Sequence, residues 1–404
     1  MLRVGRVALL LVVFVLMAAS TGAFLAPSTP RRTRQHHHRM LAGRDGKQTS
    51  RQGAILEGFA ALAGITFIAT APAVATVPIF NAGGQSATKK TILITGANSG
   101  IGLDASKKLA AAGHEVFVAC RTLAKAQEAA SAAGAAGAFE CDLTSLASVQ
   151  IFCDKWGTRP IDVLCLNAGV AMNTADTAPK FTLEGFEETI GVNHFGHFLI
   201  AQKLLPNLEK SALAHPRLVV TASSVHDPST PGGNVGPGAT LGDLQGLTDF
   251  LEHGKRFEMV DGSPFSADKA YKDSKLCNVL FTEEISRRLM ERKSKVRCNC
   301  FSPGLIPSTG LFRSQNPLFV GLFNFFALRV LGVATTIAEG GNCLVYMVEA
   351  PELEDKSAAF LATPPGKPKD LFSIQNISKE AADADKARRF WDLTEKLLAK
   401  VTKA

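Results

Sequence analysis

Residues 91–102 read TILITGANSGIG, an apolar run with β-branched residues that leads into a glycine-rich loop. The run is typical of a short buried strand, and a helical stretch around Leu103–Ala112 follows the loop. Gly96 permits a tight turn, Gly100 allows backbone to approach a pyrophosphate, and Gly102 allows close helix–strand packing. The helix N-terminus offers unpaired N–H groups to phosphates. The spacing is G-x-x-x-G-x-G rather than G-x-G-x-x-G, but the strand–loop–helix context predicts a dinucleotide site.

Strand-like and helix-like segments alternate from Lys89 onward. The predicted strands cover residues 91–95, 115–119, 138–142, 163–167 and 217–222. The predicted helices lie around residues 103–112, 124–133, 146–156 and 182–205. This alternation predicts an α/β fold, a Rossmann-type doubly wound parallel sheet with helices on both faces, in a single catalytic domain.

The ends of the predicted strands indicate which dinucleotide binds. Arg121 follows the second strand, where an acid would bind the 2′-OH of NAD and an arginine instead suits the 2′-phosphate of NADP. Asp142 ends the third strand and is placed to accept from an adenine amino group. We therefore predict NADPH as the cofactor. Its predicted site comprises Gly96, Asn98, Ser99, Gly100, Ile101, Gly102, Arg121, Asp142, Leu143, Asn167, Ala168, Gly169, Tyr271, Lys275, Pro303 and Gly304.

A second motif supplies catalytic groups. Tyr271 and Lys275 are four residues apart, which places them on one face of a helix. We expect the Lys275 ammonium to favour phenolate and so to lower the pKa of Tyr271, for proton transfer near neutral pH. Ser223, preferred over Ser224 from its offset along the strand, can hydrogen-bond the substrate oxygen or the phenol. Asn193 can hold a proton-relay water next to Lys275.

This ordered set resembles the short-chain dehydrogenase/reductase family across roughly residues 90–350. Further motifs are similar to those of the light-dependent protochlorophyllide oxidoreductases over nearly all of residues 90–400. One is the length of the segment between Ser223 and Tyr271, which are 48 residues apart. The others are Gly233–Val235, Leu241–Leu244, Met259–Gly262, Lys269–Asn278, Thr309–Arg313 and Glu380–Arg388.

The resemblance implies light-driven, NADPH-dependent reduction of the C17=C18 double bond of protochlorophyllide to chlorophyllide, in chlorophyll biosynthesis. Tyr271 would then donate the proton, and the long segment before it, with the apolar stretch Leu318–Leu331, would cover the pigment. The chain departs from the family at Ser302–Leu305, because the usual loop is Tyr-Pro-Gly-Cys. Cys298 and Cys300 are candidate substitutes for the missing thiol. Two alternatives stay open, a light-independent carbonyl or retinol-type reductase and a non-catalytic pigment-binding paralogue.

The N-terminal region carries most of the charge. Seven of the eight net positive charges fall within residues 1–88, so the remainder is almost neutral and nucleic-acid binding is not expected. Residues 1–23 resemble a signal peptide and 24–88 a transit peptide, together a bipartite presequence of a complex plastid. Residues 58–88 are uncharged, and 58–80 are either part of that presequence or a membrane tether. The reductase domain is predicted at 89–404. Peripheral contact with a plastid membrane and oligomerisation stay open.

The eight cysteines all follow the presequence. They form no C-x-x-C pair, and most sit beside apolar residues. This pattern indicates small buried side chains with free thiols in a reducing compartment, and no metal site. The chain also has 25 Phe but only two Tyr, Tyr271 and Tyr346, which makes the motif tyrosine stand out.

Overall fold

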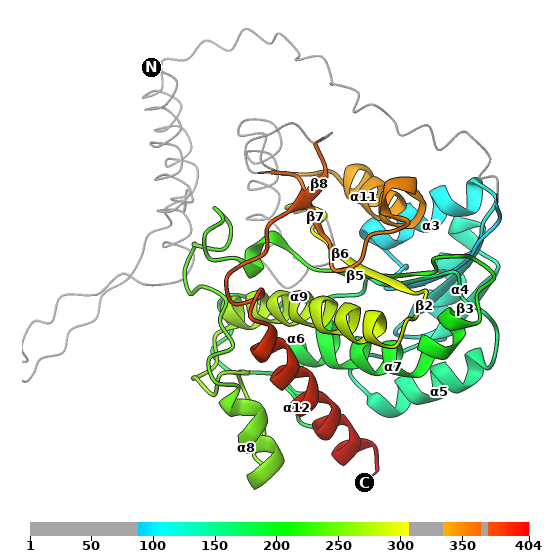
Figure 1. Cartoon of the computed structure of the whole chain (residues 1–404). Coiled ribbons are helices and arrows are strands. Elements are labelled where there is room, and N and C mark those ends of the chain that lie inside the picture. Colours follow the sequence, from blue (N-terminus) through cyan, green and yellow to red (C-terminus); the bar gives the residue numbers. More distant parts are fainter. Residues whose placement is uncertain (1–87, 307–333, 365–370, 404) are drawn as a thin grey trace, which may run out of the picture. The chain divides into compact units, whose positions relative to one another are not determined.

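The computed structural model describes residues 88–306, 334–364 and 371–403. Figure 1 shows a central sheet with helices on both of its faces. Its strands are β1 (Thr91–Thr95), β2 (Glu115–Cys120), β3 (Gly137–Glu140), β4 (Val163–Leu166), β5 (Arg217–Thr221), β6 (Arg297–Phe301), β7 (Phe360–Ala362) and β8 (Ser373–Gln375). The helices are α3 (Gly100–Ala111), α4 (Leu123–Ala133), α5 (Leu146–Trp156), α6 (Glu188–Ile190), α7 (Gly196–Glu209), α8 (Gln245–His253), α9 (Ala267–Glu291), α11 (Ile337–Glu349) and α12 (Ala384–Thr402). Shorter turns are the π-helix η1 (Gly191–Phe195) and the 3₁₀ helices η2 (Ser224–His226) and η5 (Pro351–Leu353).

The strand order is β3-β2-β1-β4-β5-β6-β7-β8. Strands β1 to β7 pair in parallel, and β8 adds an antiparallel edge to β7. The chain moves outward from β1 to β3 and then returns to β4 on the other side of β1. This reversal is the topological switch point of a doubly wound sheet, so the predicted fold class is confirmed.

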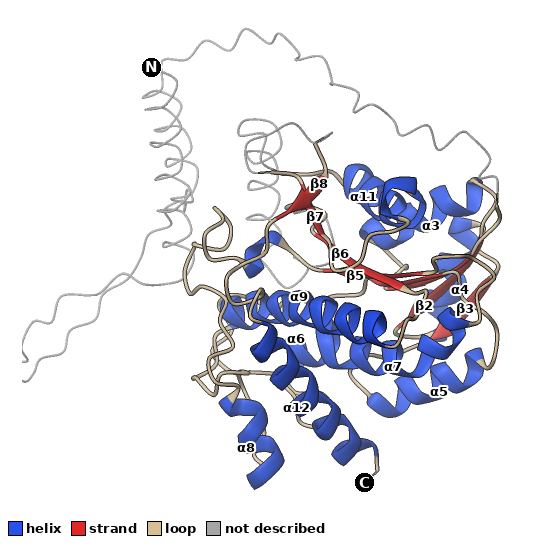
Figure 2. Ribbon diagram, viewed as in Figure 1, coloured by secondary structure: helices blue, strands red, loops and turns tan. Residues whose placement is uncertain are grey.

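Each face of the sheet has its own apolar core, because neighbouring side chains of a strand point to opposite faces. Ile92 and Ile94 of β1 pack with residues of α3, α4 and α11, whereas Leu93 packs with residues of α5, α7, α9 and α12. In Figure 2 the labelled α3 and α11 lie on one side of the strands, and α5, α7, α9 and α12 on the other. All three β1 side chains are fully buried.

One predicted helix differs from the structure. The stretch 182–205 is helical only from Glu188, after a turn in which Gly185 has a φ of +89°. The Glu187 carboxylate accepts from the N–H groups of Thr189 and Ile190, which starts the helix at that point. The helix then widens into the π-helix η1 before α7. The predicted third strand is also displaced, since β3 ends at Glu140 and leaves Asp142 in the following loop.

Several sequence predictions can be checked against burial. Seven of the eight cysteines are buried and Cys343 is partly exposed, which confirms the expectation for all but Cys343. None of the helices within the described ranges is both long and apolar enough to cross a membrane. Residues 1–87 of the predicted presequence, the apolar stretch Leu318–Leu331 and the motif Thr309–Arg313 lie outside the described residues.

Candidate active site

A cleft of about 1280 Å³, counting its open mouth, lies at the carboxyl ends of the parallel strands. It extends from the ends of β1 and β2 across the switch point to the end of β5 and the side of α9, where open α/β sheets bind their ligands. All the predicted site residues line this cleft except Asn193. Sequence reasoning missed other lining residues, namely Thr95, Ala119, Cys120, Lys125, Cys141, Thr144, Val170, Val192, Thr221, Ala222 and Ile306.

The glycine loop has the geometry for a pyrophosphate. Gly96 and Gly100 have φ values of +69° and +58°, which favour glycine. A Cβ on Gly102 would lie 2.6 Å from both the Gly96 oxygen and Asn167 Nδ2, so this glycine is needed for close packing. Ser99 precedes α3 without making a side-chain cap hydrogen bond, in contrast to the capping residues of α4 and α5. The first N–H groups of α3 are therefore suited to phosphate oxygens.

Thr95 holds the loop against the neighbouring strand. Its Oγ1 accepts from the backbone N–H of Asn167 at 2.9 Å and of Ala168 at 3.1 Å. Asn167 Nδ2 donates back to the Thr95 carbonyl at 2.9 Å. His197 Nε2 lies 2.9 Å from the same hydroxyl, and its Nδ1 lies 3.2 Å from the Asn193 carbonyl. The sequence signal for this network is the threonine before the first glycine. It was missed because the partners of Thr95 are 72 to 102 positions away along the chain.

At the nucleotide end of the cleft, the cationic groups follow β2 and the anionic group follows β3. Arg121 follows β2 directly and is exposed, and Lys125 follows it in the first turn of α4. Asp142 is the one carboxylate among the described residues that line the cleft. Its Oδ1 accepts from the Thr144 backbone N–H at 3.0 Å and from the Thr144 hydroxyl at 2.8 Å, which orients the carboxylate. An extra phosphate beside β2 would therefore meet two cations that line the cleft, Arg121 and Lys125.

The predicted catalytic pair lies at the other end of the cleft. Tyr271 and Lys275 are one turn apart on α9, with Lys275 Nζ 5.5 Å from the centre of the Tyr271 ring. Lys275 Nζ donates to the Thr221 carbonyl at 3.2 Å, which anchors it at the end of β5. Ser223 lies two residues beyond that strand and is hydrogen-bonded to the Tyr271 side chain. The three predicted catalytic groups are therefore together at this end of the cleft.

The protonation of this pair differs in one respect from the expectation. Desolvation by the surrounding protein raises the pKa of the Tyr271 phenol well above its usual value, and the hydrogen bond with Ser223 lowers it only in part. The prediction that the pKa of this phenol is lowered is wrong for the chain alone, because desolvation raises it. Burial also lowers the pKa of Lys275 to about 8. At neutral pH the phenol thus keeps its proton, as a proton donor must.

Asn193 takes a different place from the other predicted residues. It is fully buried in η1, where its Nδ2 donates to the Val170 carbonyl and to Ser274 Oγ, both at 2.9 Å. Its Oδ1 accepts from the Val170 N–H at 2.8 Å. A Cβ built on Gly169 would lie 3.4 Å from that oxygen and 3.7 Å from Lys275 Nζ. Asn193 thus joins the segment after β4 to α9, close to Lys275.

The loop after β6 closes the cleft. Pro303 and Gly304 line it, and Gly304 has a φ of +90° with no room for a Cβ, which would lie 2.3 Å from Thr335 Oγ1. The residues where this chain departs from the family differ in exposure. Ser302 is 4% exposed and Leu305 is 38% exposed. Leu305 pairs with Ala334, and its carbonyl accepts from the Thr335 N–H at 2.7 Å.

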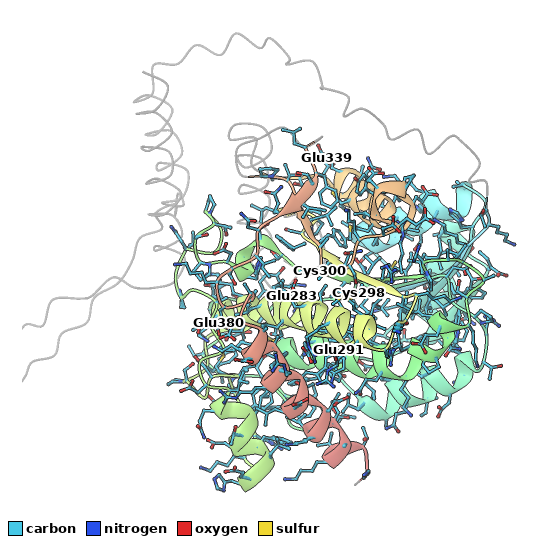
Figure 3. The ribbon with its side chains drawn as sticks, in the orientation of Figure 1. Glu283, Glu291, Cys298, Cys300, Glu339 and Glu380 are labelled. Carbon is cyan, nitrogen blue, oxygen red and sulfur yellow. The ribbon has the colours of Figure 1, made fainter. Side chains whose placement is uncertain are left out.

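Cys298 and Cys300 do not replace the missing loop thiol. Both are buried on β6, beside Glu283 of α9 (Figure 3), and neither lines the cleft. Burial raises the pKa of Cys300 to about 12 and that of Cys298 well above its usual value. These thiols therefore behave as apolar core groups rather than as proton donors to a substrate.

Comparison with known proteins identifies the family. A family model described as short chain dehydrogenase matches residues 90–238. Protochlorophyllide reductase A, chloroplastic, of Triticum aestivum is 42% identical over 84% of this chain and 89% of its own length. Protochlorophyllide reductase of Avena sativa is 43% identical over 76% of this chain and 99% of its own.

A solved structure agrees with the fold. An uncharacterized protein from Mycobacterium paratuberculosis is 28% identical and superposes with a TM-score of 0.55, over 77% of this chain and 94% of that one. The sequence identity to the plant enzymes extends over most of the chain, well beyond the segment that short-chain dehydrogenases share. The chain therefore belongs to the protochlorophyllide reductase family of short-chain dehydrogenases.

Proposed function

We propose that this chain uses NADPH and light to reduce the C17=C18 double bond of protochlorophyllide to chlorophyllide, a step of chlorophyll biosynthesis. One observation carries the proposal. In a chain of this family, Tyr271, Lys275 and Ser223 meet at one end of a cleft whose other end is formed by the glycine loop. Bound pigment would be the chromophore and the substrate at once.

The residues of the cleft fit NADPH. The uncapped N-terminus of α3 would take the pyrophosphate, and Arg121 with Lys125 would bind the 2′-phosphate. Asp142 would accept from the adenine amino group. When bound, NADPH supplies the hydride for one carbon of the double bond.

The chain itself has to deliver the matching proton. Tyr271 holds one at neutral pH, because desolvation raises the pKa of its phenol. Ser223 orients the phenol through their hydrogen bond, and Lys275 places a cation beside the ring to stabilise negative charge that develops on the oxygen. Asn193 would hold a relay water that returns a proton toward Lys275.

The Ser302–Leu305 loop favours a second candidate, a light-independent reductase acting on a carbonyl substrate. A small buried Ser302 and an exposed, apolar Leu305 supply neither the phenol nor the thiol of the usual pattern. A carbonyl oxygen could still meet Tyr271 and Ser223 in the same cleft. A pigment-binding paralogue without activity is the remaining alternative.

The proposal includes the cellular setting. The relatives named above include a chloroplastic enzyme, and we place this chain in a plastid as well. Residues 1–23 would be a signal peptide, 24–88 a transit peptide, and 89–404 the reductase domain. This arrangement suits a plastid with extra envelope membranes. Peripheral attachment to a plastid membrane and self-association would be further properties of the imported protein.

The test uses the whole chain, mixed in darkness with NADPH and protochlorophyllide. We expect a red shift of the pigment spectrum on mixing and a chlorophyllide band only after a flash of light. Tyr271→Phe should bind NADPH as before and form product at least about 100-fold more slowly, the usual contribution of a general acid. Conversion in darkness or undiminished turnover by Tyr271→Phe would contradict the mechanism. Pigment binding without conversion would instead indicate a non-catalytic, pigment-binding paralogue.

A further inference from the structure

His226 contacts the backbone of Ser223, the proposed catalytic serine. It ends η2, three residues after Ser223, and it is 1% exposed. Its ring packs edge-on against Phe360 of β7, with the ring centres 4.8 Å apart. On its other side is Ser378, in the segment that leads into α12 and is 152 residues away in sequence. The imidazole thus lies between the active-site loop and the C-terminal segment.

The hydrogen bonds of His226 determine its tautomer. The backbone N–H of Ser378 can only donate, so His226 Nε2, 3.2 Å away, must accept. The ring proton is then on Nδ1, which donates to the Ser223 carbonyl at 2.8 Å. Burial lowers the pKa of His226 and favours this neutral form. Both ring nitrogens are therefore used, and each bond has one possible direction.

Ser223 depends on such support because it lies beyond the regular sheet. Strand β5 ends at Thr221, and the last sheet-like bond is from the Ala222 N–H to the Phe301 carbonyl. The Ser223 carbonyl then accepts from both the backbone N–H and Nδ1 of His226, at 3.2 and 2.8 Å. Its side chain is hydrogen-bonded to Tyr271. A shift of the Ser223 backbone would therefore move the partner of the phenol.

The C-terminal segment also holds the long segment before Tyr271. Glu380, two residues after Ser378, accepts from the Leu241 N–H at 2.8 Å and pairs with Lys386 at 2.7 Å. Ser378 Oγ accepts from the Ala381 N–H, which closes the turn around these residues. A single turn before α12 therefore contacts His226 on one side and residue 241 on the other.

We propose that His226 is a positioning residue that fixes Ser223 and, through it, the phenol of Tyr271. The inference rests on the proposed role of Ser223 and Tyr271 as the proton-delivering pair. The positioning role depends more on the hydrogen bond from Nδ1 to Ser223 than on the bond between Nε2 and Ser378, because only the first contacts the proposed catalytic residue.

Two substitutions separate the two bonds. In His226→Asn the side-chain amide replaces Nδ1 and can still donate to Ser223, whereas in His226→Gln it replaces Nε2 and can still accept from Ser378. We expect His226→Gln to slow flash-driven product formation about tenfold, the effect of one lost hydrogen bond, with NADPH affinity unchanged. His226→Asn should keep the rate within about threefold. Equal losses in the two variants would overturn the proposal.

A second readout does not depend on turnover. The chain has only two tyrosines, so ¹³C-tyrosine labelling gives one ring signal for Tyr271 and one for Tyr346, assigned with Tyr346→Phe. The Tyr346 hydroxyl bonds Glu352 on α11's side of the sheet, so its signal shows whether each variant is folded. Ser223→Ala gives the Tyr271 signal without its serine partner. We expect His226→Gln to move the signal toward that position and His226→Asn to leave it near wild type.

His114 supplies the matched control. It is also a buried histidine with both ring nitrogens bonded, to the Lys90 N–H and to Glu349, and it lies at the opposite ends of the strands. His114→Gln should lower the melting temperature without moving the Tyr271 signal. An unmoved Tyr271 signal in folded His226→Gln refutes positioning. If wild-type protein converts no pigment, the proposed function fails, while the Tyr271 signal still decides the role of His226.

Discussion

Glu283 of α9 provides a stability prediction whose size follows from the structure. Its carboxyl group is partly buried beside Cys298 and Cys300, and no hydrogen bond or ion pair to it occurs among the described residues (Figure 3). Desolvation raises the pKa of Glu283 from 4.5 to about 7. The next residue, Glu284, is instead held by Arg287 and Arg288, which lower its pKa.

The sign follows from linkage. A carboxyl group whose pKa is raised on folding stabilises the protein only while it is protonated, and this contribution is lost as the pH rises from about 4.5 to about 7. The shift corresponds to at most about 3.4 kcal/mol, from 1.36 kcal/mol per pKa unit, and because the carboxyl group is partly exposed, solvent screening reduces the part between pH 5 and pH 9 to about 1–2 kcal/mol. Glu283→Gln removes the charge and should therefore stabilise the protein more at pH 9 than at pH 5 by about that amount.

Urea unfolding at both pH values measures the free energy of unfolding of wild type and variant. Glu284→Gln is the matched control on the same helix turn. It loses two arginine partners, so it should destabilise at pH 9 and do so less as the pH falls through the pKa of Glu284. The reasoning fails if Glu283→Gln changes the free energy of unfolding equally at pH 5 and pH 9. It also fails if Glu283→Gln and Glu284→Gln change the free energy of unfolding at pH 9 in the same direction.

Three further predictions concern the cofactor, the loop over the cleft and acid stability. Arg121→Ala should weaken NADPH binding by roughly 10-fold or more and NADH binding far less, and titrations in which both dissociation constants rise by the same factor would contradict the NADP assignment. Gly304→Ala should lower the free energy of unfolding by about 2–3 kcal/mol in thermal unfolding, because backbone strain at φ +90° adds to a clash with Thr335. Gly113→Ala is the control, with a φ of +93° and open space around the new Cβ, and it should lower the free energy of unfolding by about 1 kcal/mol. His194 is fully buried, and its pKa is lowered from 6.5 to about 4. It should therefore reduce the free energy of unfolding by up to about 3.4 kcal/mol as the pH falls from 6.5 to below 4. In His194→Phe, the free energy of unfolding measured with urea should decrease less over this pH range.

Much of the fold and the site followed from local sequence patterns. The strands β1, β2, β4 and β5 and the helices α4 and α5 were predicted to within about one residue, because short apolar runs and helical periodicity depend on neighbours in the chain. The glycine loop, the Tyr271–Lys275 pair and the strand-end Ser223 were found for the same reason. Each is a motif of fixed spacing, and a parallel sheet brings the ends of its strands to one edge.

Tertiary structure decided what depends on distant partners and on depth. The contacts of Thr95 with Asn167 and of His226 with Ser378 join residues 72 and 152 positions apart, which no local pattern encodes. The start of α6 was misjudged because the Glu187 side chain caps it after a left-handed Gly185. The pKa of Tyr271 was misjudged because a motif shows which charge is near, whereas desolvation depends on how much protein surrounds the phenol. The sequence by itself predicted which groups meet in the cleft, and only the folded chain determined their protonation and their hydrogen-bond partners.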